Sequence, residues 1–227
     1  MIIAIDGPSG SGKSSVAADV AKKLKFNCLD TGAMYRSIAY VALKINVDLN
    51  DEDALVDICQ NNKISFKNIS NNLREVYINS KNVTKEIRTK EINKAVTPVC
   101  KLKRVRHELT KQQRDICKSD NYVVEGRDIG SVVFPDADLK IYLFADIEEC
   151  AKRRFLQNKR SGFSNVDYDK VLNDLKRRDF EDSNRDVAPL TQVEDAIKID
   201  STNLTQQEVV DRICDLWKKI EERNNKH

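Results

Sequence analysis

The sequence is poor in histidine and has no closely spaced cysteines. Only His107 and His227 occur among its 227 residues, and none of the six cysteines forms a C-x-x-C pair. Zinc sites usually need close pairs of such ligands, so the sequence argues against a zinc cluster. The amino-terminal residues form the first expected strand and leave no cleavable signal peptide. We therefore expect a cytoplasmic protein with reduced thiols.

Long apolar runs and a strong charge excess are also missing. No stretch approaches the ~20 apolar residues that span a membrane, so we expect no membrane partner. The net charge of +3 is too small to indicate nucleic-acid binding. The basic segment 101–106 has no interleaved aromatic residues, and such residues are typical of single-strand binding surfaces. The Asp-x-x-Gly and Asn-Lys-x-Asp motifs of switch GTPases do not occur, which argues against a regulatory GTPase.

A phosphate-binding loop is present at the amino terminus. Residues 7–14 read Gly-Pro-Ser-Gly-Ser-Gly-Lys-Ser, follow an apolar strand at 2–6 and precede a helical pattern. Glycines bring backbone N–H groups close to phosphate oxygens, and the helix N-terminus adds positive charge. Lys13 can reach the terminal phosphates, and the Ser14 hydroxyl can ligate Mg²⁺. The expected ATP-binding residues are Gly7, Pro8, Ser9, Gly10, Ser11, Gly12, Lys13, Ser14 and Ser15.

Short apolar runs alternate with amphipathic segments along the chain, which predicts an α/β fold with a five-stranded parallel sheet covered on both faces. The interval 63–84 instead shows period-two alternation and predicts a small inserted antiparallel meander. The expected strands are 2–6, 26–30, 122–125, 140–144 and 196–200. The expected helices are 13–25, 32–45, 51–61, 101–118, 147–158, 168–183 and 205–222.

Three further groups of residues point to a second phosphate site. Asp30–Arg36 and Glu125–Gly130 each follow a strand, and ligands bind at the carboxyl ends of parallel strands. Between positions 152 and 178, nine basic residues stand against three acidic ones around a glycine-containing loop, which is typical of a mobile lid. If the acceptor is a phosphate monoester, its oxygen needs no strong base. Arginines and Mg²⁺ are then required to overcome charge repulsion.

With these residues assembled, nearly the whole chain resembles the bacterial cytidylate kinases, which have the nucleoside monophosphate kinase fold. The resemblance rests on Ile5–Ser14, Leu29–Arg36, Glu86–Thr89, Glu125–Ala137, and Asp182–Arg185 with Ala188–Leu190. It implies a three-layer P-loop kinase with a core over 1–62 and 98–227. It also implies an inserted NMP-binding module over 63–97 and a lid over 155–168.

The resemblance implies transfer of phosphate from ATP, with Mg²⁺, to CMP or dCMP. Arg36, Arg127 and Arg185 would hold the acceptor phosphate, while Thr97, Arg106 and Asp128 would read cytosine. Asp182 and Arg178 would face the sugar, and Arg153 and Arg154 would touch the donor phosphates from the lid. The implied catalytic residues are Lys13, Arg127, Arg154 and Arg185. The implied substrate-binding residues are Thr31, Tyr35, Arg36, Thr97, Arg106, Arg127, Asp128, Arg178, Asp182 and Arg185.

Two alternatives stay open from the sequence alone. A kinase for another small acceptor, such as UMP or an alcohol, would need a base, and Asp30 is the best candidate. An ATP-binding regulatory or RNA-associated protein would use the basic helix at 101–106. Thr31 and Thr97 stand where serine is equally expected, a change that keeps the hydroxyl. We expect a monomer, because the sequence has no heptad seam.

Overall fold

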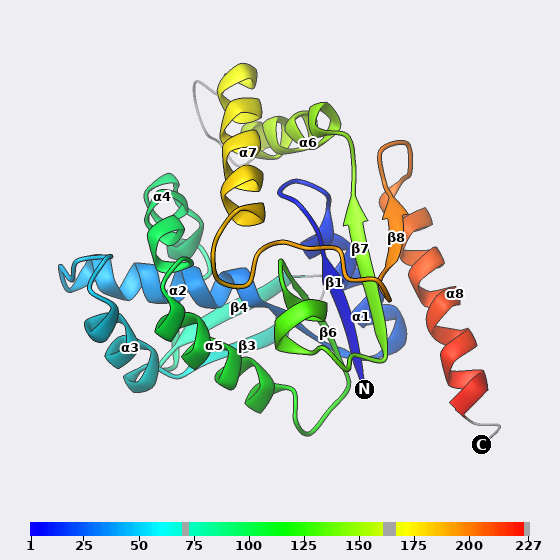
Figure 1. Cartoon of the computed structure of the whole chain (residues 1–227), viewed down its shortest axis with the longest axis horizontal. Helices are drawn as coiled ribbons and strands as arrows, with labels where there is room; N and C mark the ends of the chain where they lie inside the picture. The colour runs from blue at the N-terminus through cyan, green and yellow to red at the C-terminus, as the bar shows by residue number, and fades with distance from the viewer. Residues whose placement is uncertain (70–72, 161–166, 225–227) are drawn as a thin grey trace. The chain divides into compact units, whose positions relative to one another are not determined.

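The computed structural model describes residues 1–69, 73–160 and 167–224 (Figure 1). Most of the basic loop expected in the lid, residues 161–166, lies outside the described residues. The chain divides into two compact units, and each is described by itself. The sheet unit comprises Met1–Cys28 and Asp120–His227, and the inserted unit comprises Leu29–Ser119.

The main sheet has five strands in the order β2-β6-β1-β7-β8, as the alternating pattern predicts. Parallel pairing joins β1 to β6, β1 to β7, and β7 to β8. The strands are β1 (Ile2–Asp6), β2 (Asn27–Asp30), β6 (Tyr122–Gly126), β7 (Leu139–Phe144) and β8 (Ile197–Asp200). Because β1 is central, the loop that follows it lies at the carboxyl edge between two neighbouring strands.

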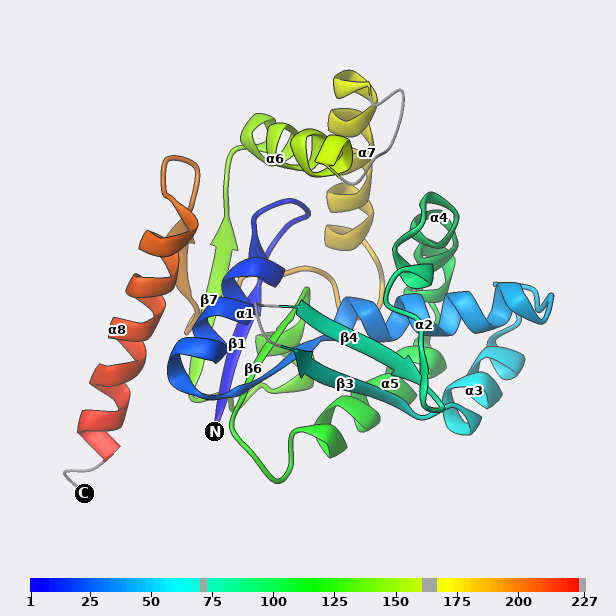
Figure 2. The same ribbon diagram turned by 180° about the vertical axis from the view of Figure 1, so that it is seen from behind.

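Helices α1 (Lys13–Leu24) and α8 (Gln206–Asn224) pack together and cover one face of this sheet (Figure 2). Alternate strand residues, such as Ile3, Ile5 and Ile141, meet these helices in one buried cluster with Trp217. The Thr205–Glu208 capping box starts α8, since Thr205 N and Oγ1 both donate to the glutamate, at 2.8 and 2.7 Å. This packing fixes the first turn of α1 against the sheet.

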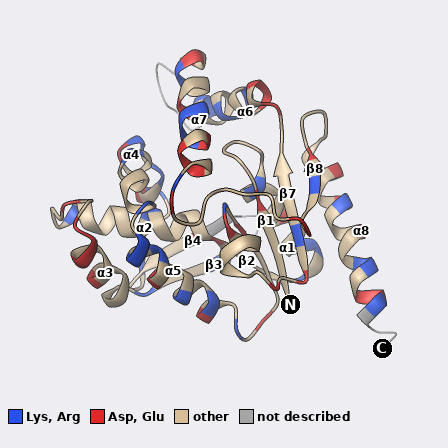
Figure 3. Ribbon diagram, viewed as in Figure 1, with Lys and Arg blue, Asp and Glu red and all other residues tan. Residues whose placement is uncertain are grey.

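A helix pair follows β7. Helix α6 (Ile147–Arg160) packs against α7 (Tyr168–Ser183), with the rings of Phe155 and Tyr168 in an edge contact at 5.9 Å. Acidic and basic residues alternate along α7 (Figure 3). Arg177, for example, pairs with Asp174 and Glu181 at the surface. Part of the local arginine density is therefore a solvated helix face.

The inserted unit combines helices with a small antiparallel sheet of order β3-β4-β5, which confirms the predicted meander. Its helices pack as the pairs α2 with α4, α2 with α3, and α3 with α5. Helix α4 was not expected from the sequence, because its last turn contains Pro98. The elements are α2 (Thr31–Lys44), α3 (Glu52–Asn61), β3 (Ile64–Ile69), β4 (Leu73–Ile78), β5 (Lys81–Asn82), η1 (Glu86–Arg88), α4 (Lys90–Val99) and α5 (Lys103–Ile116).

Candidate active site

The loop between β1 and α1 requires glycine at several positions. Gly12 caps α1 with φ of 94° and Gly10 has φ of 81°, both in the left-handed region that favours glycine. At Gly7, a Cβ atom would lie 1.9 Å from the carbonyl oxygen of Leu143, so no side chain fits there. The loop is therefore held against β7 by direct backbone contact. Its conformation leaves the first N–H groups of α1 at the sheet edge.

Lys13 is folded back onto its own loop. Its Nζ donates to the Pro8 carbonyl at 2.6 Å and lies 3.3 Å from Ser11 Oγ. The side chain is buried, and this burial, together with the positive charge of Arg127, lowers the pKa of Lys13 to about 7. A polyanion bound at the loop would favour the charged form and give Nζ a stronger partner than the Pro8 carbonyl.

Ser14 contacts a buried carboxylate. Its Oγ donates to Oε1 of Glu125 at 2.6 Å, and Glu125 is only 5 % exposed near the end of β6. Residues two apart in a strand share a face, so Glu125 lies on the same side as Val123, which packs in the α1–α8 cluster. This pairing of hydroxyl and carboxylate oxygens fits a hard divalent cation such as Mg²⁺. Mg²⁺ usually keeps several waters and binds through substrate phosphates, so few protein ligands are needed.

A network of arginines and aspartates adjoins the loop within the sheet unit. Arg127 Nε donates to Asp182 at 2.9 Å, and its Nη2 donates to Ser9 Oγ at 3.0 Å. Arg185, whose side chain is only 7 % exposed, lies 3.5 Å from both Asp128 and Asp182. Two pairs of residues expected to bind substrate, Arg127 with Asp128 and Asp182 with Arg185, lie far apart in the sequence and thus form one connected group. That group is joined to the phosphate-binding loop through Ser9.

Asp6 fixes the turn that carries Arg127 and Asp128. Its two carboxylate oxygens accept from the backbone N–H groups of Ile129 and Gly130, at 2.8 and 2.7 Å, where a single π-helical turn begins. Asp6 is buried, and burial raises its pKa to about 6 although both hydrogen bonds lower it. Asp6 was not among the site residues expected from the sequence. Its position at the end of the central strand was the available signal.

Three arginines expected near the lid or the sugar lie on α6 and α7. Arg153 is tied to the loop after β8, where it donates to Ser201 Oγ at 3.1 Å and to the Ser201 carbonyl at 2.6 Å. Arg154 is at the surface, where its Nη1 donates to Gln157 at 3.0 Å. Arg178 lies on α7, and burial lowers its pKa.

Two connections to the loop had no signal in the sequence. The backbone N–H of Ser9 donates to Asp179 of α7 at 2.7 Å, and Ser201 Oγ donates to the Ser11 carbonyl at 3.3 Å. Asp179 sits in a run of charged helical residues, where nothing local separates it from its neighbours. Its role depends on tertiary packing, which a helical pattern does not specify.

In the inserted unit, Asp30 organises the start of α2. One of its oxygens caps the helix by accepting from Ala33 N at 2.8 Å, and the other accepts from Arg36 Nη2 at 3.0 Å. At Gly32, an added Cβ would approach Arg36 Nη1 to 3.0 Å. Thr31 is the first, buried residue of α2. The segment 30–36 thus holds an arginine at a helix start, as its sequence predicts.

Arg106 is buried near the start of α5 and is held by two neutral groups. Its Nη1 donates to the Cys100 carbonyl at 3.1 Å, and its guanidinium lies 5.3 Å from the centre of the Tyr35 ring. Only 4 % of Arg106 is exposed. Thr97 is half-buried near the end of α4, three residues before Cys100. Thr97 and Arg106, two of the three residues expected to read the base, thus lie on α4 and α5, which both pack against α2. The third, Asp128, lies in the sheet unit.

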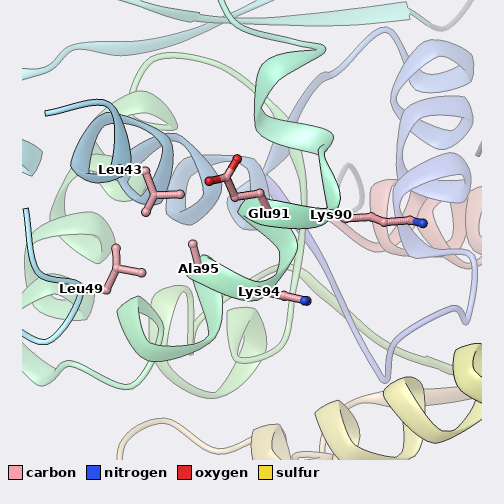
Figure 4. A pocket seen from close by; sticks show the side chains of 6 residues that line it. All are labelled: Leu43, Leu49, Lys90, Glu91, Lys94 and Ala95. Carbon is pink, nitrogen blue, oxygen red and sulfur yellow. The ribbon is translucent and has the colours of Figure 1, made fainter. Parts of the chain in front are cut away.

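An open hollow of about 510 Å³ in the inserted unit contains none of the expected site residues. Leu43, Leu49 and Ala95 form its apolar part, while the charged ends of Lys90 and Lys94 extend away from the two leucines (Figure 4). It therefore lacks the converging polar groups of a phosphate site.

Two further features are absent from the residues that the structure describes. Residues 1–69, 73–160 and 167–224 contain no group of three or more histidine, cysteine or acidic side chains placed to hold a metal ion. Within the same ranges, no helix is both long and apolar enough to cross a membrane.

Comparison with known proteins shows the family to which the chain is related. The family model described as "Cytidylate kinase" matches residues 3–219. A cytidylate kinase of Bacillus licheniformis is 43 % identical over 219 residues, which cover 96 % of each chain. An uncharacterized protein from Eubacterium ventriosum is 14 % identical, covers 95 % of this chain and 97 % of its own, and has a TM-score of 0.51, so it shares the fold.

A longer relative is also similar. The bifunctional pantoate ligase/cytidylate kinase of Prochlorococcus marinus is 48 % identical over 216 residues, or 95 % of this chain. The chain spans only 42 % of the length of that relative. The match to the family model covers nearly every residue from β1 to α8. The chain belongs to the cytidylate kinase family.

Proposed function

We propose that this protein transfers the γ-phosphoryl group of ATP to a nucleoside monophosphate, and that the acceptors are CMP and dCMP. The observation that carries the proposal is the Arg127–Asp182–Arg185–Asp128 network, joined through Ser9 to the phosphate-binding loop. A loop for one polyanion beside an arginine cluster for another suits phosphoryl transfer between two phosphates. Family membership and the Bacillus relative support the same assignment.

On the donor side, the loop N–H groups and Lys13 would hold the β- and γ-phosphates of ATP. Lys13 would exchange the Pro8 carbonyl for phosphate oxygens when ATP binds. Mg²⁺ would bind at Ser14, and when bound it neutralises charge on the β- and γ-phosphates. The remaining loop residues orient the donor through their backbone.

On the acceptor side, Arg127, Arg185 and Arg36 would bind the CMP phosphate. An oxygen of that phosphate attacks the γ-phosphorus, and the bond from the γ-phosphorus to the bridging β-oxygen breaks. CDP and ADP result. The acceptor oxygen is already anionic, so the arginines lower the barrier by offsetting repulsion rather than by accepting a proton. Arg154 and the lid would exclude water, a competing acceptor.

Base recognition would use Asp128, Arg106 and Thr97. The cytosine N4 amino group donates and suits the Asp128 carboxylate, while its O2 and N3 accept and suit Arg106 and the Thr97 hydroxyl. Arg178 and Asp182 would face the sugar. Residues 63–97 would form the module that closes on the monophosphate, within a core of 1–62 and 98–227.

Alcohol phosphorylation is less well supported. That reaction needs a carboxylate base beside the acceptor hydroxyl, and Asp30 is the candidate that the sequence offers. Both Asp30 oxygens already accept hydrogen bonds, one from the α2 backbone and one from Arg36. To accept a proton from an alcohol, Asp30 would have to weaken a contact that holds either the start of α2 or Arg36.

The test is acceptor-dependent ADP release from MgATP. CMP, dCMP, UMP, AMP, GMP and shikimate are supplied one at a time, with hydrolysis of MgATP alone as the background. We expect turnover with CMP and dCMP well above that with the other four acceptors. Turnover with another acceptor instead would contradict the base assignments, and none at all would favour an ATP-binding protein without kinase activity.

A further inference from the structure

An acidic side chain of α7 contacts the backbone of the phosphate-binding loop. The N–H of Ser9 donates to Oδ1 of Asp179 at 2.7 Å, although the two residues are 170 positions apart in the sequence. Asp179 is half-buried in the second half of α7. Backbone N–H groups in such loops bind phosphate oxygens, and a carboxylate presents oxygens of the same charge sign. The loop therefore offers to Asp179 a donor of the kind that phosphate uses.

The position of Ser9 relates this contact to the transferred phosphoryl group. Ser9 Oγ accepts from Arg127 at 3.0 Å, and Arg127 belongs to the network expected to bind the acceptor phosphate. The Ser9 end of the loop thus adjoins the acceptor side, where the terminal phosphate of the donor has to meet the acceptor. Burial and Arg127 lower the pKa of Lys13, while the nearby charge of Asp179 opposes that shift. Asp179 thus lies close to two cations expected to hold transferred phosphate.

We propose that the Asp179 carboxylate competes with the γ-phosphate of ATP for the phosphate-binding loop, so that ATP binds by displacing it. The inference rests on the proposed function and deepens it, because it concerns entry of the donor into the same site. The carboxylate and the γ-phosphate are both negative, so they repel each other and need the same Ser9 N–H. ADP has no γ-phosphate and can bind while Asp179 keeps its contact.

The competing explanation is that Asp179 only braces the loop. Two other contacts already hold the loop in place. Gly7 lies against the Leu143 carbonyl, with no room for a Cβ atom, and the Ser11 carbonyl accepts from Ser201 Oγ at 3.3 Å. The two roles predict opposite results. Loss of a brace would weaken binding of ATP and ADP alike, whereas loss of a competing charge should tighten the binding of ATP.

The experiment measures binding of a non-hydrolysable ATP analogue and of ADP to the full chain by calorimetry, each with excess Mg²⁺. In Asp179→Asn, the side-chain oxygen can still accept from Ser9, but the negative charge is lost. We expect the affinity for the ATP analogue to rise about 10-fold, because a neutral acceptor forms a weaker hydrogen bond and does not repel the γ-phosphate. The affinity for ADP should change by less than about 3-fold, since its phosphates lie farther from this charge.

Two further variants complete the test. Asp174→Asn removes the same charge from the exposed face of α7, where Asp174 pairs with Arg177, and should leave both affinities as in the wild type. Asp179→Ala removes the hydrogen-bond acceptor together with the charge. It should tighten binding of the ATP analogue at least as much as Asp179→Asn does, and it serves if the asparagine variant fails to fold.

Unchanged or weaker binding of the ATP analogue in either Asp179 variant would overturn the proposal. So would equal gains in affinity for the ATP analogue and for ADP, or a gain of the same size in Asp174→Asn. None of these measurements contains an acceptor. A wild type that fails to phosphorylate CMP would therefore contradict the proposed function without affecting them, while wild-type affinities in Asp179→Asn with normal turnover of CMP would overturn this inference alone.

Discussion

Two groups of arginines, one in each unit, are held in different ways. In the sheet unit, Arg127 and Arg185 share Asp182, and Arg185 also meets Asp128. In the inserted unit, Arg106 is held by a backbone carbonyl and an aromatic ring. The first arrangement supplies a dense group of charges of both signs, while the second places a buried cation against a carbonyl and an aromatic ring.

The two arrangements suit two different tasks, stabilisation of the transferred phosphoryl group and recognition of a base. An arginine network braced by carboxylates keeps several guanidinium groups aligned, which suits a transition state whose charge spreads over phosphate oxygens. A buried arginine held against a ring and a carbonyl has a fixed direction, which suits hydrogen bonding to the acceptor atoms of a base. Substitutions in the two groups should therefore alter different kinetic constants.

The largest effect is expected for Arg127→Ala. Losing one arginine at the transferred phosphoryl group costs about 10³-fold or more in kcat. Because this charge acts on the reaction and not on the base, the loss should be the same for CMP and dCMP. Steady-state ADP release measures it, with Arg177→Ala on the exposed face of α7 as control. A change confined to the KM for ATP would contradict the assignment.

Asp6→Asn should change how stability depends on pH. The pKa of Asp6 is raised to about 6 in the folded protein from 3.8. The contribution of Asp6 to the free energy of unfolding is thus fully present below pH ~4 and is lost as the pH rises through ~6. The total loss is about 3 kcal/mol. Roughly half of that loss falls between pH 5 and pH 7.5. Urea unfolding of both proteins at these two pH values should show the variant gaining relative to the wild type.

The comparison of pH values is what makes this test specific. The asparagine leaves one of the two N–H groups at Ile129 and Gly130 facing another donor, at a cost of about 1–3 kcal/mol at either pH. A variant whose stability deficit is the same at pH 5 and pH 7.5 would show that Asp6 does not titrate with the raised pKa.

Arg106→Ala should act on the acceptor alone. A base-reading arginine that is lost costs about 1–3 kcal/mol of selective binding, so the KM for CMP should rise about 10–100-fold while the KM for ATP stays unchanged. The measurement is ADP release at varied CMP and then at varied ATP. Equal increases in the KM for CMP and the KM for ATP would indicate that Arg106 stabilises the inserted unit and does not bind the base.

The smallest effect is expected for Tyr35→Leu, which removes the ring from beneath Arg106 and keeps an apolar side chain. Cation–π contacts contribute about 0.5–2 kcal/mol, so the KM for CMP should rise about 3–10-fold. Combining this change with Arg106→Ala should add little, since the two residues act together. Full additivity in this double-mutant cycle would contradict the coupling.

The sequence predicts the parts of this site that depend on local pattern. The glycine loop and the strand ends at Asp30 and Arg127 follow from periodicity and from the edge rule for parallel sheets. The five-stranded sheet and the meander were predicted for the same reason. The ring of Tyr35 beneath Arg106 was not, because it joins two helices whose packing no local pattern specifies.

Two other features that the sequence did not predict, helix α4 and the contact of Asp179 with Ser9, also depend on tertiary packing. Helix α4 contains Pro98 and β-branched residues, so its local propensity is weak and its tertiary packing against α2 decides its form. Asp179 reaches Ser9 from 170 positions away, and its surrounding charge pattern indicates only a solvated helix. The roles given to the individual site residues stay predictions until the variants above are measured.

The anchoring of Arg153 has a consequence for the design of chimeras. Its bonds to Ser201, and that of Asp146 N to Thr202 at 2.9 Å, attach the first half of α6 to the loop after β8. The same half also packs against α7, because Cys150 and Ala151 share a buried cluster with Val171 and Leu175. A segment exchanged between relatives should therefore be joined downstream of Arg153, since a junction at the start of α6 would take Arg153 and Ser201 from different proteins.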